Sequence, residues 1–212
     1  MAFATDRDLL VLEPLLFRDV GWSAQTLVDV ADVAVTGAVA QSASSDFNVA
    51  GVMAGMVAVL DGVPVEILEV TSATTLTVSR LRQVGDETAI PPAAGTGLTM
   101  VVASFGPQLE LIHGQTLRSL GIEPSDAAAS PSAADIVNPM AVALVESLGA
   151  LHLILSAAAA MVGPGSVLWA KAGLYRDRFD AARRRVVVEI DLDGDGAADA
   201  ARRMNTTQFV RG

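Results

Sequence analysis

Residues 60–79 read LDGVPVEILEVTSATTLTVS, and this stretch decides the fold. The Asp-Gly pair at positions 61 and 62 separates two runs rich in β-branched residues, and this pair supplies the positive φ angles of a tight hairpin turn. Further on, residues 75–79 alternate polar and apolar side chains, which predicts a strand with one face in a core and the other in water. The stretch therefore predicts antiparallel β structure.

Similar runs extend on both sides of this stretch. Five β-rich runs lie at residues 33–40, 51–60, 63–70, 74–81 and 97–104. Short strands at this spacing are typical of a small barrel or sandwich. We therefore expect residues 27–105 to form an inserted β-rich subdomain.

A short helical pattern precedes the β-rich segment. Thr5 or Asp6 is a suitable N-cap for a helix that continues to Phe17, and Pro14 is expected to split or kink that helix. We assign residues 1–26 to the same helical core as the chain beyond residue 105.

Helical spacing returns after Pro107. Apolar residues recur every three or four positions from Leu109 to Leu120, and residues 139–162 and 166–183 predict two longer helices that form an antiparallel pair. The predicted fold class is α+β. It comprises a helical bundle core from residues 1–26 and 106–184, a small barrel or sandwich at 27–105, and a C-terminal β-hairpin arm at 185–212.

The terminal hairpin contains an acidic turn. Asp191, Asp193 and Asp195 place carboxylates at alternate positions before the bend at Gly196, and Asp199 follows at position nine when Asp191 is position one. Such spacing is typical of a calcium-binding loop, but position twelve of that loop would be Arg202 instead of a bidentate glutamate. The alternative is a hairpin turn in which the glycines supply positive φ angles and the carboxylates are solvated. We predict the solvated turn and no metal, with calcium as the weaker alternative.

Charge is distributed unevenly along the chain. The formal net charge is −10, yet residues 171–185 contain six basic side chains and two acidic ones, a local charge of +4. Such a cluster is a solvated face or a docking surface for an acidic partner or a DNA backbone. The candidate interaction residues are Arg183, Arg184 and Arg185 at the base of the hairpin, Arg202 and Arg203 on its return strand, and Phe209.

The sequence offers no strong catalytic or cofactor-binding pattern. There is no cysteine, and the histidines are His113 and His152, of which His152 lies on an apolar helical stripe. Glu66, Glu69 and Glu110 have no partner at a spacing that indicates paired-carboxylate chemistry. We therefore expect no enzymatic activity and no cofactor.

The hydrophobic content indicates contacts with other subunits and not with a membrane. Residues 147–162 form the longest apolar stretch, which is shorter than the ~20 residues that span a bilayer. The charged residues among the first eight are unlike a signal peptide. Since 51% of the chain is hydrophobic and 18% is charged, we expect an oligomer in which subunits cover apolar surface.

Several segments, together with the order of elements, carry a family resemblance. They are residues 65–67 (Val-Glu-Ile), residues 72–82, residues 104–108 (Ser-Phe-Gly-Pro-Gln), residues 171–179 with Lys171, Tyr175, Arg176, Arg178 and Phe179, and residues 191–205. In these segments the chain resembles the head-to-tail adaptor proteins of tailed bacteriophages and related phage-like particles.

This resemblance implies a structural virion protein, assembled in the host cytoplasm. It implies a homo-oligomeric, dodecameric ring beneath the portal protein, which continues the DNA channel and docks a tail or stopper protein of the neck. DNA would pass through the lumen without specific binding, because acidic walls repel phosphates. The hairpin is expected to dock on a neighbouring subunit or on the portal. The alternative function is a calcium-binding cell-surface or adhesive module that uses the Asp191 to Asp199 loop.

Overall fold

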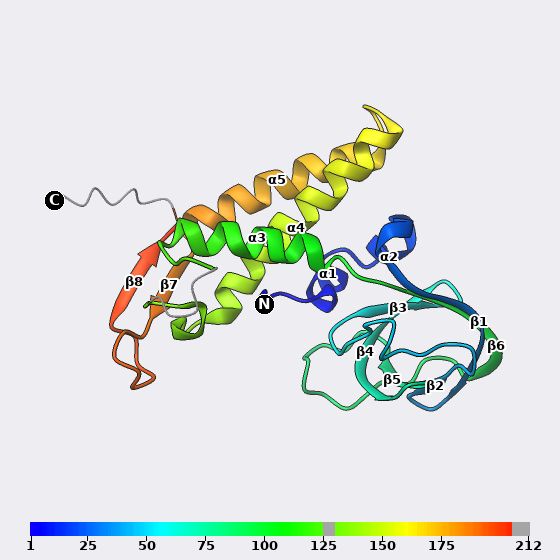
Figure 1. Cartoon of the computed structure of the whole chain (residues 1–212). Coiled ribbons are helices and arrows are strands. Elements are labelled where there is room, and N and C mark those ends of the chain that lie inside the picture. Colours follow the sequence, from blue (N-terminus) through cyan, green and yellow to red (C-terminus); the bar gives the residue numbers. More distant parts are fainter. Residues whose placement is uncertain (125–129, 205–212) are drawn as a thin grey trace. The chain divides into compact units, whose positions relative to one another are not determined.

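The computed structural model describes residues 1–124 and 130–204. The chain divides into two compact units. Figure 1 labels their helices and strands. We call Thr5–Phe105 the barrel unit, and Met1–Ala4 together with Gly106–Gly212 the helical unit. The sequence-based grouping placed residues 1–26 with the later helices, whereas only the first four residues belong to that unit here.

Six antiparallel strands of the barrel unit close into a barrel in the order β1-β2-β5-β4-β3-β6, with β6 paired to β1. The strands are β1 (Thr26–Thr36), β2 (Val39–Gln41), β3 (Val57–Leu60), β4 (Val63–Ser72), β5 (Thr75–Ser79) and β6 (Gly95–Ala103). The α+β class is confirmed, and the β-rich segment is a closed barrel. One more strand forms than expected because the chain turns at Gly37, with φ of 60°, inside the run predicted as one strand.

The sequence explains the barrel locally. Asp61 and Gly62 have φ of 48° and 80°, so they form the predicted turn between β3 and β4. On β5, Leu76 and Val78 are buried and Thr75 and Thr77 are partly exposed, as the alternation predicts. The barrel core consists mainly of valines, with Phe47, Leu60, Ile67, Leu76 and Met100 as its larger members.

Two short helices open the barrel unit. These are α1 (Asp6–Leu12) and α2 (Leu16–Asp19), and the break between them contains Pro14, as predicted. Thr5 is the N-cap of α1, and its backbone N–H donates to Asp8 Oδ2 at 2.8 Å. A 3-10 turn at Ser23–Gln25 leads into β1.

The helical unit contains α3 (Gly106–Ser119), α4 (Pro139–Val162) and α5 (Val167–Arg185), followed by β7 (Val187–Ile190) and β8 (Ala200–Arg203). A 3-10 turn at Ala133–Asp135 precedes α4. Figure 1 shows α4 and α5 as a long antiparallel hairpin, as predicted. Its second helix is capped by Ser166, whose Oγ accepts the Trp169 N–H at 3.2 Å.

The close approach of these helices occurs at a glycine. A Cβ at Gly149 of α4 would lie 2.9 Å from Ile112 Cγ2 of α3 and 2.9 Å from Phe179 Cε2 of α5. The sequence placed the close contact at residues 157–160, where only Ala158 and Ala159 are buried. The absence of a side chain at Gly149 therefore permits α3 and α5 to approach α4 closely at this position.

We expect Gly149→Ala to lower the free energy of unfolding by about 1–3 kcal/mol, because the overpacking outweighs the higher helix propensity of alanine. The matched control is Gly173→Ala in α5, where a Cβ meets no atom within 4 Å. That change should raise stability by up to about 1 kcal/mol. Urea unfolding of both variants checks the prediction, and shifts of the same sign would contradict it.

The helix α4 is longer than the apolar stretch predicted from residue 147 onward. It has 24 residues and, by length and composition alone, could cross a membrane. However, 56% of its most apolar 18-residue segment is buried inside the protein. Core helices of water-soluble proteins meet the same criterion. Here α4 packs against α3, α5 and β7, and Glu146 is among its buried side chains.

Candidate interaction site on the terminal hairpin

The terminal hairpin forms, but it is not an extended arm. β7 pairs with β8 in antiparallel register, from Val187 opposite Arg203 to Ile190 opposite Ala200. Val188 and Ile190 are fully buried. They form a cluster with side chains from α3, from the segment after α3, from α4 and from Met204 after β8. The strand β7 is therefore part of the core of the helical unit.

A second edge of β7 is held by the segment before α4. Asn138 Nδ2 donates to Val187 O at 3.0 Å, and the Glu189 N–H donates to Asn138 Oδ1 at 3.0 Å. The Val137 N–H donates to Glu189 O at 2.9 Å, and Ile136 forms a bridge with Ile190. Because both edges of β7 are bonded within the chain, this strand has no free edge for a neighbouring sheet.

The acidic turn brings Asp191, Asp193 and Asp195 close enough that one carboxylate oxygen from each lies within 4.8 Å of the others. These carboxylates accept backbone N–H groups of the turn: Asp191 Oδ1 accepts from Gly194 at 2.7 Å and its Oδ2 accepts from Gly196 at 2.8 Å. Hydrogen bonds from Gly196 and Gly194 lower the pKa of Asp191. The turn is thus stabilised by its own backbone.

The other two positions of the predicted metal loop, Asp199 and Arg202, are outside this group of three carboxylates. Asp199 Oδ2 accepts the Leu192 N–H at 2.7 Å. Arg202, at the position where a glutamate ligand was required, donates its Nη1 to Leu120 O at 2.6 Å, just beyond the end of α3. Arg202 supplies no carboxylate at this position, and its guanidinium group instead bonds to the chain just after α3.

The arginines at the end of α5 differ in their surroundings. All three are exposed, and the Arg183 guanidinium also lies 5.5 Å from the centre of the Phe179 ring. Arg203 on β8 is also exposed. The structure therefore separates the predicted basic residues into those on α5 and those on β8, and Phe209 lies outside the described residues.

Sequence reasoning missed Arg118, which lies in the last turn of α3 and shares a surface hollow with Arg202 and Arg203. Residues 118 and 202 are distant in sequence, so no local pattern relates them. The hydrogen bond from Arg202 to Leu120 O is what places β8 beside the end of α3.

A buried carboxylate in the helical unit was also missed. Glu146 is fully buried, and its Oε1 lies 2.7 Å from His113 Nδ1. Its Oε2 accepts the backbone N–H groups of Phe3 at 2.8 Å and Ala4 at 3.0 Å. Glu146 thereby binds the first residues of the chain to α4. His152, in contrast, contacts its own helix and α5: its Nδ1 lies 3.2 Å from Ala172 O and 3.1 Å from Ser156 Oγ.

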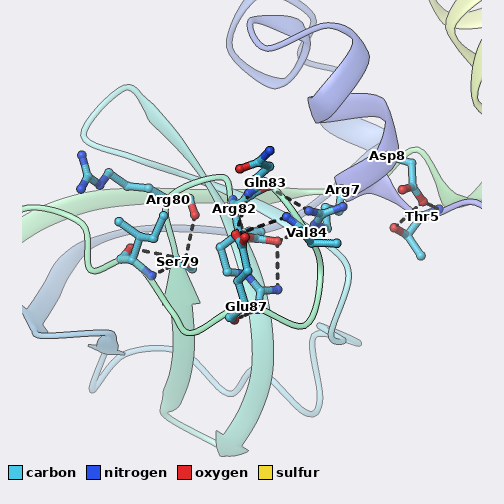
Figure 2. A network of polar contacts seen from close by, with 11 residues as sticks. Thr5, Arg7, Asp8, Ser79, Arg80, Arg82, Gln83, Val84 and Glu87 are labelled. Carbon is cyan, nitrogen blue, oxygen red and sulfur yellow. Dashed lines mark hydrogen bonds and ion pairs between the residues drawn. The ribbon is translucent and has the colours of Figure 1, made fainter.

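The barrel unit holds a second buried carboxylate, Glu66 on β4. Its Oε2 accepts Arg7 Nε at 2.7 Å, and its Oε1 accepts Arg82 Nε at 2.7 Å and the Arg82 backbone N–H at 2.9 Å. Both arginines are labelled in Figure 2. Burial alone would raise the pKa of Glu66, but the hydrogen bonds from Arg82 and Arg7 outweigh it and lower the pKa. No partner of Glu66 was evident from the sequence. The structure shows two, Arg7 of α1 and Arg82 of the segment after β5.

Asp6 is a third buried carboxylate. Its Oδ1 accepts the Phe105 N–H at 2.8 Å, yet burial raises its pKa to about 6, against hydrogen bonds from Ser104 and Phe105 that lower it. The ordinary pKa of 3.8 applies when the chain is unfolded. Between these pH values the folded state binds more protons, so the stability that Asp6 contributes is complete below pH 3.8 and is lost as the pH rises to about 6.

We therefore expect Asp6→Asn to exceed the wild type in stability at pH 7 by about 1–3 kcal/mol, and the difference to vanish near pH 4. An asparagine amide keeps an acceptor for the Phe105 N–H and carries no charge. Urea unfolding at a series of pH values checks this. Asp19→Asn, at an exposed position, is the control; a stability difference for Asp6→Asn that is constant with pH would contradict the assignment.

Comparison of the chain with protein-family models, with curated proteins and with solved structures found no match.

Proposed function

We propose that this protein is a structural component of the neck of a tailed bacteriophage or phage-like particle. In this role it is a head-to-tail adaptor that forms a ring beneath the portal, continues the DNA channel and docks the tail. The helices α3, α4 and α5 serve as the helical core around which subunits assemble. The proposal rests on the resemblance described above and on features of the surface.

Exposed apolar side chains at the turn between α4 and α5 are the observation that carries the proposal. Met161 is 80% exposed, Val162 58%, Val167 71% and Trp169 51%. These four large apolar side chains lie within nine residues at the connection between α4 and α5, and we call them the apolar patch. Protein partners cover exposed apolar groups of this kind. A subunit of a ring has such a partner in its neighbour.

The charge of the barrel unit supports the same role. Residues 5–105 contain 12 acidic and four basic side chains. This unit therefore holds half of the acidic residues of the chain but fewer than a third of its basic residues. Exposed acidic groups on this unit include Asp29, Asp32, Asp46 and Glu69. A surface of this sign repels a phosphate backbone and allows DNA to pass without binding.

The test measures assembly of the full chain and its dependence on the apolar patch. We expect a ring-sized species by native mass spectrometry, and Val167→Ser with Trp169→Ser should weaken self-association at least about tenfold. The control is Val49→Ser with Met53→Ser, which changes two exposed apolar residues of the barrel unit. The wild-type chain should restore tail attachment to heads assembled without this protein, and the variant with the changed apolar patch should not. A chain that neither assembles nor restores attachment would overturn the proposal.

Calcium binding is the second candidate, which the proximity of Asp191, Asp193 and Asp195 favours. Because backbone N–H groups already stabilise the turn, we expect millimolar calcium to leave the melting temperature unchanged, and chelation likewise. A specifically bound ion would raise the melting temperature by mass action, and Asp193→Asn would abolish that increase. An increase of this kind would establish the calcium-binding alternative.

A further inference from the structure

A surface hollow of about 550 Å³ lies in the helical unit, between the end of α3 and strand β8. Its walls are formed by Arg118, Ser119, Leu120, Gly121, Ala201, Arg202 and Arg203. Three guanidinium groups thus belong to one small hollow in a chain whose formal net charge is −10. This concentration of positive charge is not explained by the core packing of the hairpin.

Among the residues that the structure describes, the guanidinium groups of Arg118, Arg202 and Arg203 form no ion pair, whereas Arg7, Arg18, Arg82 and Arg176 each do. Like charges that share a hollow repel each other, and a bound anion relieves this repulsion. The unpaired cations therefore favour a negatively charged occupant.

The hollow has a fixed wall. The Arg202 guanidinium is held by Leu120 O at 2.6 Å, and this bond uses one of its five N–H donors. Gly121 has φ of 71°, and a Cβ there would lie 3.4 Å from Arg202 Nη1. Glycine at this position leaves space beside the guanidinium. Arg118 and Arg203 are exposed, so their side chains are accessible to a ligand.

We propose that this hollow binds a carboxylate side chain from an acidic segment of a protein partner. Guanidinium groups bind carboxylates through paired, charge-assisted hydrogen bonds, and three of them suit a segment with more than one acidic residue. A nucleic acid fits less well. Its continuous phosphate backbone would extend past the hollow along a hairpin whose turn holds Asp191, Asp193, Asp195 and Asp199, whereas an acidic peptide inserts individual side chains.

The test uses the full chain and a fluorescein-labelled hexaglutamate peptide as the probe, with fluorescence anisotropy at low salt. We expect saturable binding with one peptide per chain. Arg118→Gln with Arg203→Gln should raise the dissociation constant at least about tenfold, since two charge-assisted contacts are lost. Both positions are exposed, so the variant should retain the wild-type melting temperature, which is measured in parallel.

The matched control is Arg176→Gln with Arg178→Gln, which removes the same charge from α5 at positions outside the hollow. Its dissociation constant should stay within about twofold of the wild type, since only long-range charge changes. Equal losses in the two double variants would overturn the proposal, because binding would then follow net charge. So would the absence of saturable binding, or tighter binding of a six-nucleotide DNA that depends on Arg118 and Arg203. The measurement needs no ring, so its outcome is independent of the neck assignment.

Discussion

Replacing Glu66 by alanine should lower the free energy of unfolding of the barrel unit by about 3 kcal/mol, because breaking a buried ion pair leaves its partner uncompensated. Glu66 is 1% exposed and accepts four hydrogen bonds from Arg7 and Arg82. Without it, two guanidinium groups and one backbone N–H lose their acceptor. The loss should separate α1 from β4 before the barrel itself unfolds.

Trp22 provides the signal for this measurement, since its ring lies 5.5 Å from Phe105 in the barrel unit. In a Trp169→Phe background, all tryptophan fluorescence comes from that unit. Glu69→Ala is the control: Glu69 lies on the same strand but is exposed, so its loss should change stability by less than about 0.5 kcal/mol. Equal effects of the two substitutions would show that the Glu66 network contributes nothing to stability.

The second large effect concerns the hairpin. We expect Ile190→Ala to lower the free energy of unfolding of the helical unit by about 2–5 kcal/mol, because Ile190 is fully buried with Val142, Val145 and Val188 and its loss leaves a cavity. Leu192→Ala, two residues further on and half exposed, should change stability by less than about 0.5 kcal/mol. Circular dichroism at 222 nm during urea unfolding follows both variants.

The burial of β7 also means that deleting the hairpin does not test its role in assembly. Deletion of residues 186–212 would remove Val188 and Ile190 from the core, so a loss of assembly after that deletion would report unfolding of the helical unit. Point changes at exposed positions such as Arg203 test the interaction and leave the core intact. A truncated chain with unchanged helix stability would contradict the burial of β7.

The barrel could be predicted because its signals are local. The positive φ angles at Asp61 and Gly62 depend on two adjacent residues, and the alternation of Thr75 to Val78 shows within one strand. The extra strand was missed because Gly37 stands inside a run of apolar residues without a second turn residue beside it. Strand number depends on where such a run folds back, which composition does not encode.

The polar contacts could not be predicted, because their partners are distant in the sequence. Glu66 meets Arg7 59 positions away, and Glu146 meets the backbone of Phe3 143 positions away. A backbone N–H has no side-chain signal at all. For the hairpin, the Val and Ile pattern indicated one apolar face, but it did not say whether the same chain or another subunit covers it. That choice depends on tertiary packing.

The hydrogen bond from the Phe105 N–H to Asp6 Oδ1 spans 2.8 Å and fastens the two ends of the barrel unit to each other. A segment whose ends meet in this way can enter a host sequence between two neighbouring residues without stretching the host chain. Ala4 and Gly106 are the host residues at this junction. The barrel unit thus has the geometry of an inserted domain, which a recombination event could add or remove as one piece.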